Sequence, residues 1–439
     1  MTEQDAISTA AAIQSGEVTV AETAATVRER VEREDGAINA VTWMSDTLVP
    51  PPSGAIGPLA GVPWLLKASL EFPNWPFTSC SRARKDVIGQ TMWPFARACI
   101  EAGLVPVGLT GMPEFGLLTT GEPLASGPVV NPHLPGRSAG GSSSGAAAAV
   151  AAGFAPLAHA SDAAGSIRIP AANCGVIGLK PSRGGNLRAR APHLIDDVLC
   201  SDMLIARTMR DVKAAFDIVG IAQEPRSLSD FRGLKVGLVL HGLDERQADA
   251  DVVAVIRRAA DALDRAGAIV EPARMPGDLP AIGQAFRTIW LHEGRELIEA
   301  IAAANPGAAL EDLLEPWTLG LAQKCASLPL EATAAMFRQF GESERACRSF
   351  FSEYDLLLSP VAQERPIELG RHAPDRPFDE LWDDFWPFVN FTPLANIAGL
   401  PSITLPFWDG TEGPTGTMLT MAKGRDLDLL ALSSSVDPA

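Results

Sequence analysis

Residues 136–184 read GRSAGGSSSGAAAAVAAGFAPLAHASDAAGSIRIPAANCGVIGLKPSRG. Serine, glycine and alanine dominate this stretch, where a buried segment would normally carry Leu, Ile and Val. This composition indicates that backbone segments approach one another closely here. We predict a tightly packed helix over residues 145–152 and a strand over 154–160, followed by a polar turn at Ser161 and Asp162. We therefore expect this stretch to serve a function in addition to packing of the core.

Ser138 lies in a formal G-x-S-x-G pattern, which is typical of the nucleophile elbow of α/β-hydrolases. An elbow needs a strand directly before the pattern and a helix directly after it. Pro132 and Pro135 stand where that strand would be, and proline is excluded from central strands. We therefore interpret residues 136–140 as a loop.

Ser142 and Ser166 fit a chemical role better than Ser138 does. Ser166 follows the predicted turn and precedes a short helical turn, so it lies where a strand gives way to a helix. At such a junction the backbone amides of Ala163, Ala164, Gly165 and Ser166 can converge on one point. We predict that these four amides form an oxyanion hole.

A serine nucleophile needs a base that accepts its proton. His133, His159 and His193 lie near this stretch, but none has the sequence context of a Ser-His-Asp triad. The alternative base is Lys67, which ends the apolar, strand-like run of residues 61–67. A lone lysine in this position is commonly a solvated strand end, whereas a buried and neutral lysine can accept a proton.

Three segments together resemble the amidase signature family of serine hydrolases: GPLAGVP at 57–63, the stretch at 136–184 and FTPLANIAGLP at 391–401. The resemblance covers nearly the whole chain. It implies a Ser-cisSer-Lys catalytic unit with Lys67 as base, Ser142 as the middle serine and Ser166 as nucleophile. No metal or other cofactor is implied.

In this family the middle serine relays the proton between nucleophile and lysine, and the peptide bond before it is cis. Gly141 occupies that preceding position here, where the absence of a side chain reduces steric conflict. Asp162 and Arg168 flank the nucleophile and resemble the family's structural ion pair.

Two residues depart from the family pattern. Ala164 stands where the family usually has a glycine, and Ala68 follows the catalytic lysine where an aspartate is common. A methyl group at residue 164 would narrow the oxyanion site or require a backbone conformation that alanine tolerates poorly. We interpret both departures as tuning of the site.

The predicted fold class is α/β, with a large central mixed β-sheet covered by helices on both faces in a single domain of residues 1–439. Its signature core spans about 60–210, and a helical, aromatic-rich substrate-pocket region spans about 280–390. Periodicity predicts the following elements: helices at 6–15, 19–34 and 93–102, strands at 40–44 and 105–109, and a β-α-β unit within 234–271.

The predicted substrate pocket contains Met112, Cys174, Trp382 and Trp386. Met112 belongs to a segment that resembles the family's loop at the edge of the substrate cleft. Both tryptophans belong to an aromatic cluster at 378–391, which is either ordinary core or an apolar pocket. Residues 186–200 are predicted to form a loop.

The formal net charge of −17, with no cluster of Lys and Arg, argues against nucleic acid and anionic membranes as partners. Six scattered cysteines without C-x-x-C spacing favour free thiols over a metal site or a disulfide framework. The acidic amino terminus does not resemble a signal peptide, and no apolar run is long enough to span a membrane. We expect a cytoplasmic monomer or homodimer that acts on a small molecule.

Three classes of function are compatible with these observations. The first is a hydrolase of hydrophobic linear or aryl amides, with carbamates (urethanes) and esters as further substrates, similar to nylon-oligomer hydrolases and aryl acylamidases. The second is an amidotransferase A-type subunit that releases ammonia from glutamine for a partner. The third is a catalytically silent binding scaffold, which the presence of all three triad residue types disfavours.

Overall fold

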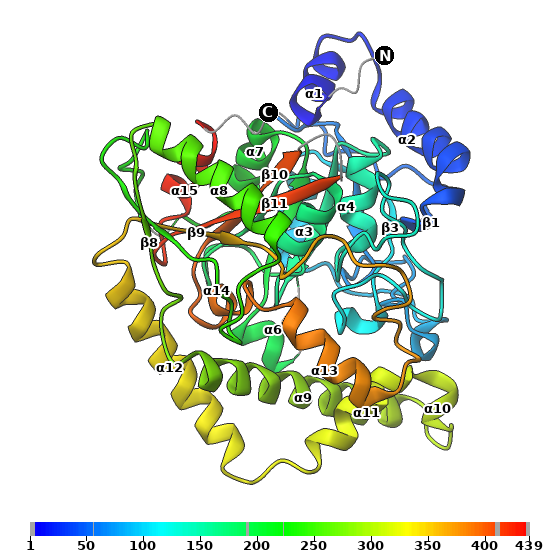
Figure 1. The fold of residues 1–439 in the computed structure, drawn as a ribbon. Helices are drawn as coiled ribbons and strands as arrows, with labels where there is room; N and C mark the ends of the chain where they lie inside the picture. The colour runs from blue at the N-terminus through cyan, green and yellow to red at the C-terminus, as the bar shows by residue number, and fades with distance from the viewer. Residues whose placement is uncertain (1–4, 56, 190–192, 223, 409–412, 436–439) are drawn as a thin grey trace.

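The computed structural model describes the chain except for residues 1–4, 56, 190–192, 223, 409–412 and 436–439 (Figure 1). One mixed sheet lies in the amino-terminal half of the chain, with the strand order β1-β3-β2-β4-β6. Strand β2 is central and runs parallel to β3 and β4, whereas β1 and β6 are antiparallel edge strands. The strand bounds are Val41–Met44 (β1), Pro63–Lys67 (β2), Val105–Thr110 (β3), Leu157–Asp162 (β4) and Ser201–Ala206 (β6).

A second mixed sheet has the order β5-β10-β11-β9-β7-β8. Its strands are Gly178–Lys180 (β5), Ser402–Trp408 (β10), Pro414–Thr420 (β11), Leu356–Pro360 (β9), Lys235–Leu238 (β7) and Ile269–Pro272 (β8). Strands β7 and β8 are parallel and enclose helix α8 (Ala250–Arg265) in sequence, which confirms the predicted β-α-β unit.

The two sheets meet at the edges formed by β6 and β5. The Ile177 amide donates to the Ala206 carbonyl at 2.9 Å, and the Ala206 amide donates back to the Ile177 carbonyl at 3.3 Å. The predicted mixed α/β architecture is therefore confirmed, with its strands divided between two mixed sheets that one antiparallel bridge connects.

Helices flank both sheets (Figure 1). Helix α4 packs on the first sheet and α5 packs on β10 and β11, which places the segments before α4 and α5 at the junction of the sheets. Helix α4 is buried along most of its length and consists mainly of Ala. A Cβ atom at Gly145 would lie 2.2 Å from the Ala40 carbonyl oxygen, so only glycine allows this approach. The helices around the sheets are α1 (Ala6–Gln14), α2 (Val20–Glu34), α3 (Pro94–Glu101), α4 (Ser144–Ala151), α5 (Arg168–Cys174), α7 (Met209–Val219), α14 (Pro393–Ile397) and α15 (Asp426–Ser433).

The region predicted to be helical at about 280–390 is mainly helical, although strand β9 lies within it. It contains α9 (Leu279–Ala304), α10 (Leu310–Leu313), α11 (Pro316–Cys325) and α12 (Ala332–Phe350), and α13 (Phe378–Phe388) packs against α11. Figure 1 shows these helices gathered at the end of the molecule opposite α1 and α2. No helix in the described part of the chain is long and apolar enough to cross a membrane.

Two local predictions were wrong. Ser161 and Asp162 belong to strand β4 and pair with Asp202 and Ser201 of β6, where we predicted a turn. Polar side chains are tolerated at this end of β4 because residues from other segments form hydrogen bonds with them. The loop predicted at 186–200 includes helix α6 (Leu194–Val198), while residues 190–192 of that loop lie outside the described residues.

Candidate active site

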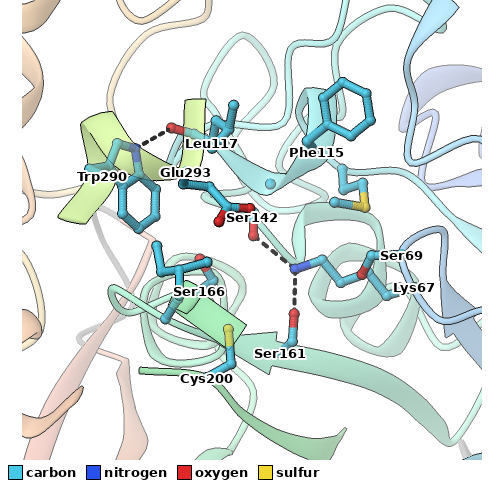
Figure 2. A pocket seen from close by; sticks show the side chains of 14 residues that line it. Lys67, Ser69, Phe115, Leu117, Ser142, Ser161, Ser166, Cys200, Trp290 and Glu293 are labelled. Atoms are coloured by element: carbon cyan, nitrogen blue, oxygen red, sulfur yellow. Dashed lines mark hydrogen bonds between the residues drawn. The ribbon is translucent and has the colours of Figure 1, made fainter. Parts of the chain in front are cut away.

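Lys67 is the last residue of the buried strand β2, and 1% of its surface is exposed. Its Nζ donates to Ser142 Oγ at 2.8 Å and to Ser161 Oγ at 3.0 Å (Figure 2). The residues of the preceding apolar run are fully buried, as its composition predicts. A lysine can accept a proton only in its neutral form.

Ser142 lies in the turn that leads into α4, and the peptide bond between Gly141 and Ser142 is cis. Gly141 packs tightly against the backbone of residues 118–120, because a Cβ atom at Gly141 would lie 2.8 Å from the carbonyl carbon of Thr119. Glycine is therefore needed at residue 141, and the turn presents the Ser142 hydroxyl to Lys67.

Ser166 lies between the end of β4 and the start of α5, as the sequence predicts, and is 2% exposed. The Ser143 amide donates to the Ser166 carbonyl at 3.2 Å, which ties the segments of the two serines together. Lys67, Ser142 and Ser166 all line one cavity of about 30 Å³. The structure thus brings the three predicted catalytic side chains to the same cavity.

The predicted oxyanion hole is changed in one respect. The Gly165 amide donates to Asp162 Oδ1 at 2.7 Å, so this amide is already used within the protein. Among the described residues, no hydrogen bond is made by the amides of Ala163, Ala164 or Ser166. Ala163 and Ser166 also line the cavity, so the amides of these two residues are the ones placed to receive an oxyanion.

Asp162 and Arg168 form a fully buried ion pair that holds the turn before Ser166. The guanidinium reaches Asp162 through Nε at 2.9 Å and through Nη2 at 2.8 Å. Burial alone would raise the pKa of Asp162, but Arg168 and the Asn396 amide hold that pKa well below its usual range. Arg168 also donates to Asn396 Oδ1 at 2.6 Å and to the Thr392 carbonyl at 3.0 Å. The late segment 391–401 therefore completes the support of the nucleophile.

The structure shows the surroundings of Ala164 and Ala68, the two residues that depart from the family pattern. Ala164 is absent from the described residues with positive φ, so its methyl group causes no backbone strain. Gly165, in contrast, has φ +120° and a Cβ there would lie 2.4 Å from Thr392 Oγ1, so glycine is required. Ala68 packs in a small apolar cluster with Cys80 and Met112 beside the cavity, where an aspartate would be buried among apolar groups.

Met112 lines the cavity, as predicted, but the three other predicted pocket residues lie elsewhere among the described residues. Cys174 is buried in α5 and its Sγ donates to the Ala139 carbonyl at 3.4 Å. Trp382 packs on Trp317 with ring centroids 6.2 Å apart. Trp386 lines a different cavity of about 260 Å³. The aromatic cluster is mostly core, because its rings pack on one another and on the helical region.

Sequence reasoning missed several residues of the cavity wall, which come from segments far apart in the chain. They are Ser69, Phe115, Gly116, Leu117, Ser161, Ile195, Cys200, Trp290 and Glu293. Phe115 and Gly116 belong to the loop that resembles the edge of the family's cleft, so their proximity to Met112 was the available signal. For Ser161 and Glu293 no local pattern existed.

The cavity wall at residues 114–117 is anchored to the helical region. The indole N–H groups of Trp290 and Trp317 both donate to the Leu117 carbonyl, at 3.2 and 3.1 Å. Glu114 accepts from the Glu315 amide at 3.0 Å and from Thr318 Oγ1 at 2.7 Å, and burial raises its pKa. Helices α9 and α11 are thereby held against the site.

His159 and Ser138, two alternative candidates for catalytic residues, have other surroundings in the structure. His159 Nε2 lies 3.1 Å from Asp202 Oδ1, and its ring packs edge-on against Phe95 at 4.9 Å. Ser138 is buried in an antiparallel bridge with Val130, and its Oγ accepts from the Gly140 amide at 3.0 Å. Neither residue lines the cavity of Ser166 within the described part of the chain.

Comparison with known proteins agrees with this geometry. The model of the Amidase family matches residues 44–430, so the chain belongs to the Amidase family. The putative amidase AmiC of Mycobacterium tuberculosis (strain H37Rv) is 30% identical over 457 residues, covering 99% of this chain and 94% of AmiC. The 6-aminohexanoate-cyclic-dimer hydrolase of Pseudomonas sp. (strain NK87) is also 30% identical, with 99% of this chain and 94% of that protein covered.

Solved structures extend the comparison to the fold. A structure of 6-aminohexanoate cyclic dimer hydrolase has a TM-score of 0.87 at 30% identity, covering 98% of this chain and 96% of the other. A bacterial aryl acylamidase has a TM-score of 0.85 at 23% identity, with 98% of this chain and 95% of the other covered, and this likeness concerns the fold alone.

A further relative by sequence is the A-type subunit of the glutamyl-tRNA(Gln) amidotransferase from Natronomonas pharaonis, which is 31% identical, with 87% of this chain and 96% of that protein covered. The chain is accordingly an amidase-family hydrolase of carbon–nitrogen bonds.

Proposed function

We propose that the chain hydrolyses amides through an acyl-enzyme on Ser166, with Ser142 and Lys67 as the proton relay. The observation that carries this proposal is the 2.8 Å hydrogen bond between Lys67 Nζ and Ser142 Oγ at a cavity that Ser166 also lines. A buried lysine next to a serine provides a base without histidine.

The reaction follows from the placement of these groups. Ser166 Oγ attacks the carbonyl carbon while its proton passes to Ser142 and the Ser142 proton passes to Lys67. The tetrahedral oxyanion accepts hydrogen bonds from the amides of Ala163 and Ser166, which line the cavity. The relay then returns a proton to the departing nitrogen, the C–N bond breaks, and water hydrolyses the ester on Ser166 by the reverse route.

We propose hydrophobic linear or aryl amides as substrates, with carbamates and esters cleaved as well. The apolar side chains of Met112, Phe115, Leu117 and Trp290 on the cavity wall support an apolar acyl or leaving group. The similarity to 6-aminohexanoate-cyclic-dimer hydrolase supports aliphatic amides of the aminohexanoate type. Carbamates and esters pass through the same kind of tetrahedral intermediate at a carbonyl carbon.

The test combines a substrate panel with loss of the nucleophile. Acyl anilides, aminohexanoate oligomers, small carbamates and primary amides should reveal the preferred class. Ser166→Ala should reduce turnover of every substrate by several orders of magnitude and leave the melting temperature nearly unchanged. Near-normal turnover by a highly purified Ser166→Ala protein would refute the role of Ser166.

An amidotransferase A-type subunit is the second candidate, because the chain is similar to one protein of that type. That function requires hydrolysis of glutamine to glutamate and ammonia. A glutaminase assay on the purified chain separates the two candidates, since an amidase with an apolar cavity should leave glutamine intact. Release of ammonia from glutamine at a rate above that from hydrophobic amides would favour the amidotransferase function.

A further inference from the structure

Two cavities lie one after the other along the same face of helix α9. Trp290 lines the catalytic cavity of about 30 Å³, whereas Gly283 and Phe286 line the cavity of about 260 Å³ that Trp386 also lines. Residues 283, 286 and 290 recur at steps of three and four, which places them on one face of the helix. At a rise of about 1.5 Å per residue, Phe286 and Trp290 are only about 6 Å apart along the helix axis. The two cavities are therefore close neighbours.

The rings of Trp290 and Phe286 form the wall between these cavities. Their ring centroids are 5.6 Å apart, and Phe286 packs edge-on against Trp386 at 5.8 Å. Both Phe286 and Trp290 are buried. Trp290 faces the catalytic cavity and Phe286 faces the larger cavity, so the two rings stand in series between them.

Trp290 is held in place from two sides. Its indole N–H donates to the Leu117 carbonyl at 3.2 Å (Figure 2), and its ring packs on Phe286. A cavity of about 30 Å³ has room for about two water molecules, so a substrate must displace side chains to bind there. The unbranched side chain of Met112 on the same cavity adapts its shape easily. Met112 can therefore move aside, whereas Trp290 remains as a fixed wall.

We propose that Trp290 is a specificity-determining residue that limits the length of the substrate's hydrophobic group on the α9 side of the scissile bond. The preferred substrate then carries a short alkyl group on this side and its larger hydrophobic group on the other. The cavity beyond Phe286, with Trp386 and Val389 among its apolar lining residues, is the space that a longer group occupies once the rings are removed. This inference rests on the proposed function, because it takes Ser166 as the nucleophile.

The first test measures how hydrolysis depends on chain length. Anilides of acetic, butanoic, hexanoic and octanoic acid vary the acyl group, while N-ethyl, N-butyl, N-hexyl and N-octyl acetamide vary the amine. In the wild type, kcat/KM should fall as the chain lengthens in at least one of these series. Trp290→Ala should raise the ratio of kcat/KM for the six-carbon chain to that for the shortest chain in that series by about tenfold or more.

The order of the two rings provides a second test. Phe286→Ala alone should leave the chain-length preference unchanged, because Trp290 still closes the catalytic cavity. Combining Phe286→Ala with Trp290→Ala should extend the preference to the eight-carbon chain, since the two cavities then join. Either of two results would overturn the role of Trp290: an unchanged preference in both series for Trp290→Ala, or a lengthening by Phe286→Ala alone equal to that by Trp290→Ala.

Trp317→Phe is the matched control. Trp317 also donates its indole N–H to the Leu117 carbonyl, at 3.1 Å, but within the described part of the chain it does not line the catalytic cavity. This variant removes one of the two donors to the carbonyl, as Trp290→Ala does, and should keep the wild-type preference. The same lengthening in Trp317→Phe would overturn the proposal.

Labelling of Ser166 by a small fluorophosphonate reports whether each variant retains a folded active site. If Trp290→Ala is not labelled, Trp290→Leu takes its place, because it removes less of the core. Failure of the probe to label the wild type would refute the role of Ser166. Labelling of every variant with an unchanged chain-length preference would overturn the role of Trp290 alone, so the two failures are distinguishable.

Discussion

Ser161 Oγ lies 3.0 Å from Lys67 Nζ, and the two residues belong to the neighbouring parallel strands β4 and β2. Lys67 therefore has two serine acceptors, Ser142 from a loop and Ser161 from a strand (Figure 2). The sheet fixes the second contact, so in the proposed relay Ser161 orients the amine and Ser142 exchanges the proton. Ser161 is a positioning residue in this interpretation.

Ser161→Ala should lower kcat/KM for an amide by about tenfold, because a less ordered Lys67 meets Ser142 in the productive geometry less often. Ser161→Thr retains the hydroxyl on a residue suited to strands and should recover most of the rate. Steady-state kinetics with circular dichroism of each variant checks this. Equal losses in the alanine and threonine variants would show that the hydroxyl contact does not matter.

Lys67→Ala should remove amide hydrolysis more severely than ester hydrolysis. An ester alkoxide departs without being protonated, whereas an amide nitrogen needs the proton that Lys67 and Ser142 return. The measurement is kcat/KM on an amide and an ester with the same acyl group, for wild type and variant. A loss of about the same size on both substrates would mean that Lys67 acts only in acylation or has only a structural role.

Arg168→Ala should lower the melting temperature and the activity together. The variant leaves Asp162 buried without its cation, and breaking a buried ion pair in this way costs about 3–5 kcal/mol. Thermal unfolding and amide turnover are the readouts, with Arg232→Ala as a control because that arginine pairs with Asp230 on the surface. An unchanged melting temperature with altered substrate preference would assign Arg168 to binding.

Lys180 provides a prediction for the pH dependence of stability. Burial lowers the pKa of Lys180 to about 7, and the charge of Arg168 acts in the same direction, while Asp162 and Asp426 oppose the shift. A lysine in the unfolded chain has a pKa of about 10.4. Between these values the unfolded state binds more protons than the folded state, so the free energy of unfolding contributed by Lys180 rises with pH.

Lys180→Met should therefore reduce this rise. Urea unfolding of wild type and variant at pH 7 and pH 9.5 checks the effect, because groups common to both proteins cancel in the difference. The wild type should gain stability relative to the variant at the higher pH. Parallel pH profiles for the two proteins would show that Lys180 is not titrating in this range.

Much of the fold follows from local pattern. The apolar run before Lys67 specifies a buried strand, and the Gly and Ala content around residue 145 specifies a helix that approaches other backbone closely. The helical region after residue 279 was predictable because helix periodicity persists over many residues. The polar end of β4 was not predictable, since its partners lie in other segments.

For this protein the sequence alone determined the chemical groups and the elements that carry them: Lys67 at a strand end, Ser142 before a helix and Ser166 after a strand. The tertiary structure decided which other side chains meet these groups. It placed Ser161 on Lys67 across 94 residues of sequence, engaged the Gly165 amide with Asp162, and brought Glu293 to the cavity in place of Trp382 and Trp386. The physical reason is that periodicity reports which residues of an element are buried, whereas the neighbour that each buried residue meets depends on how distant elements pack.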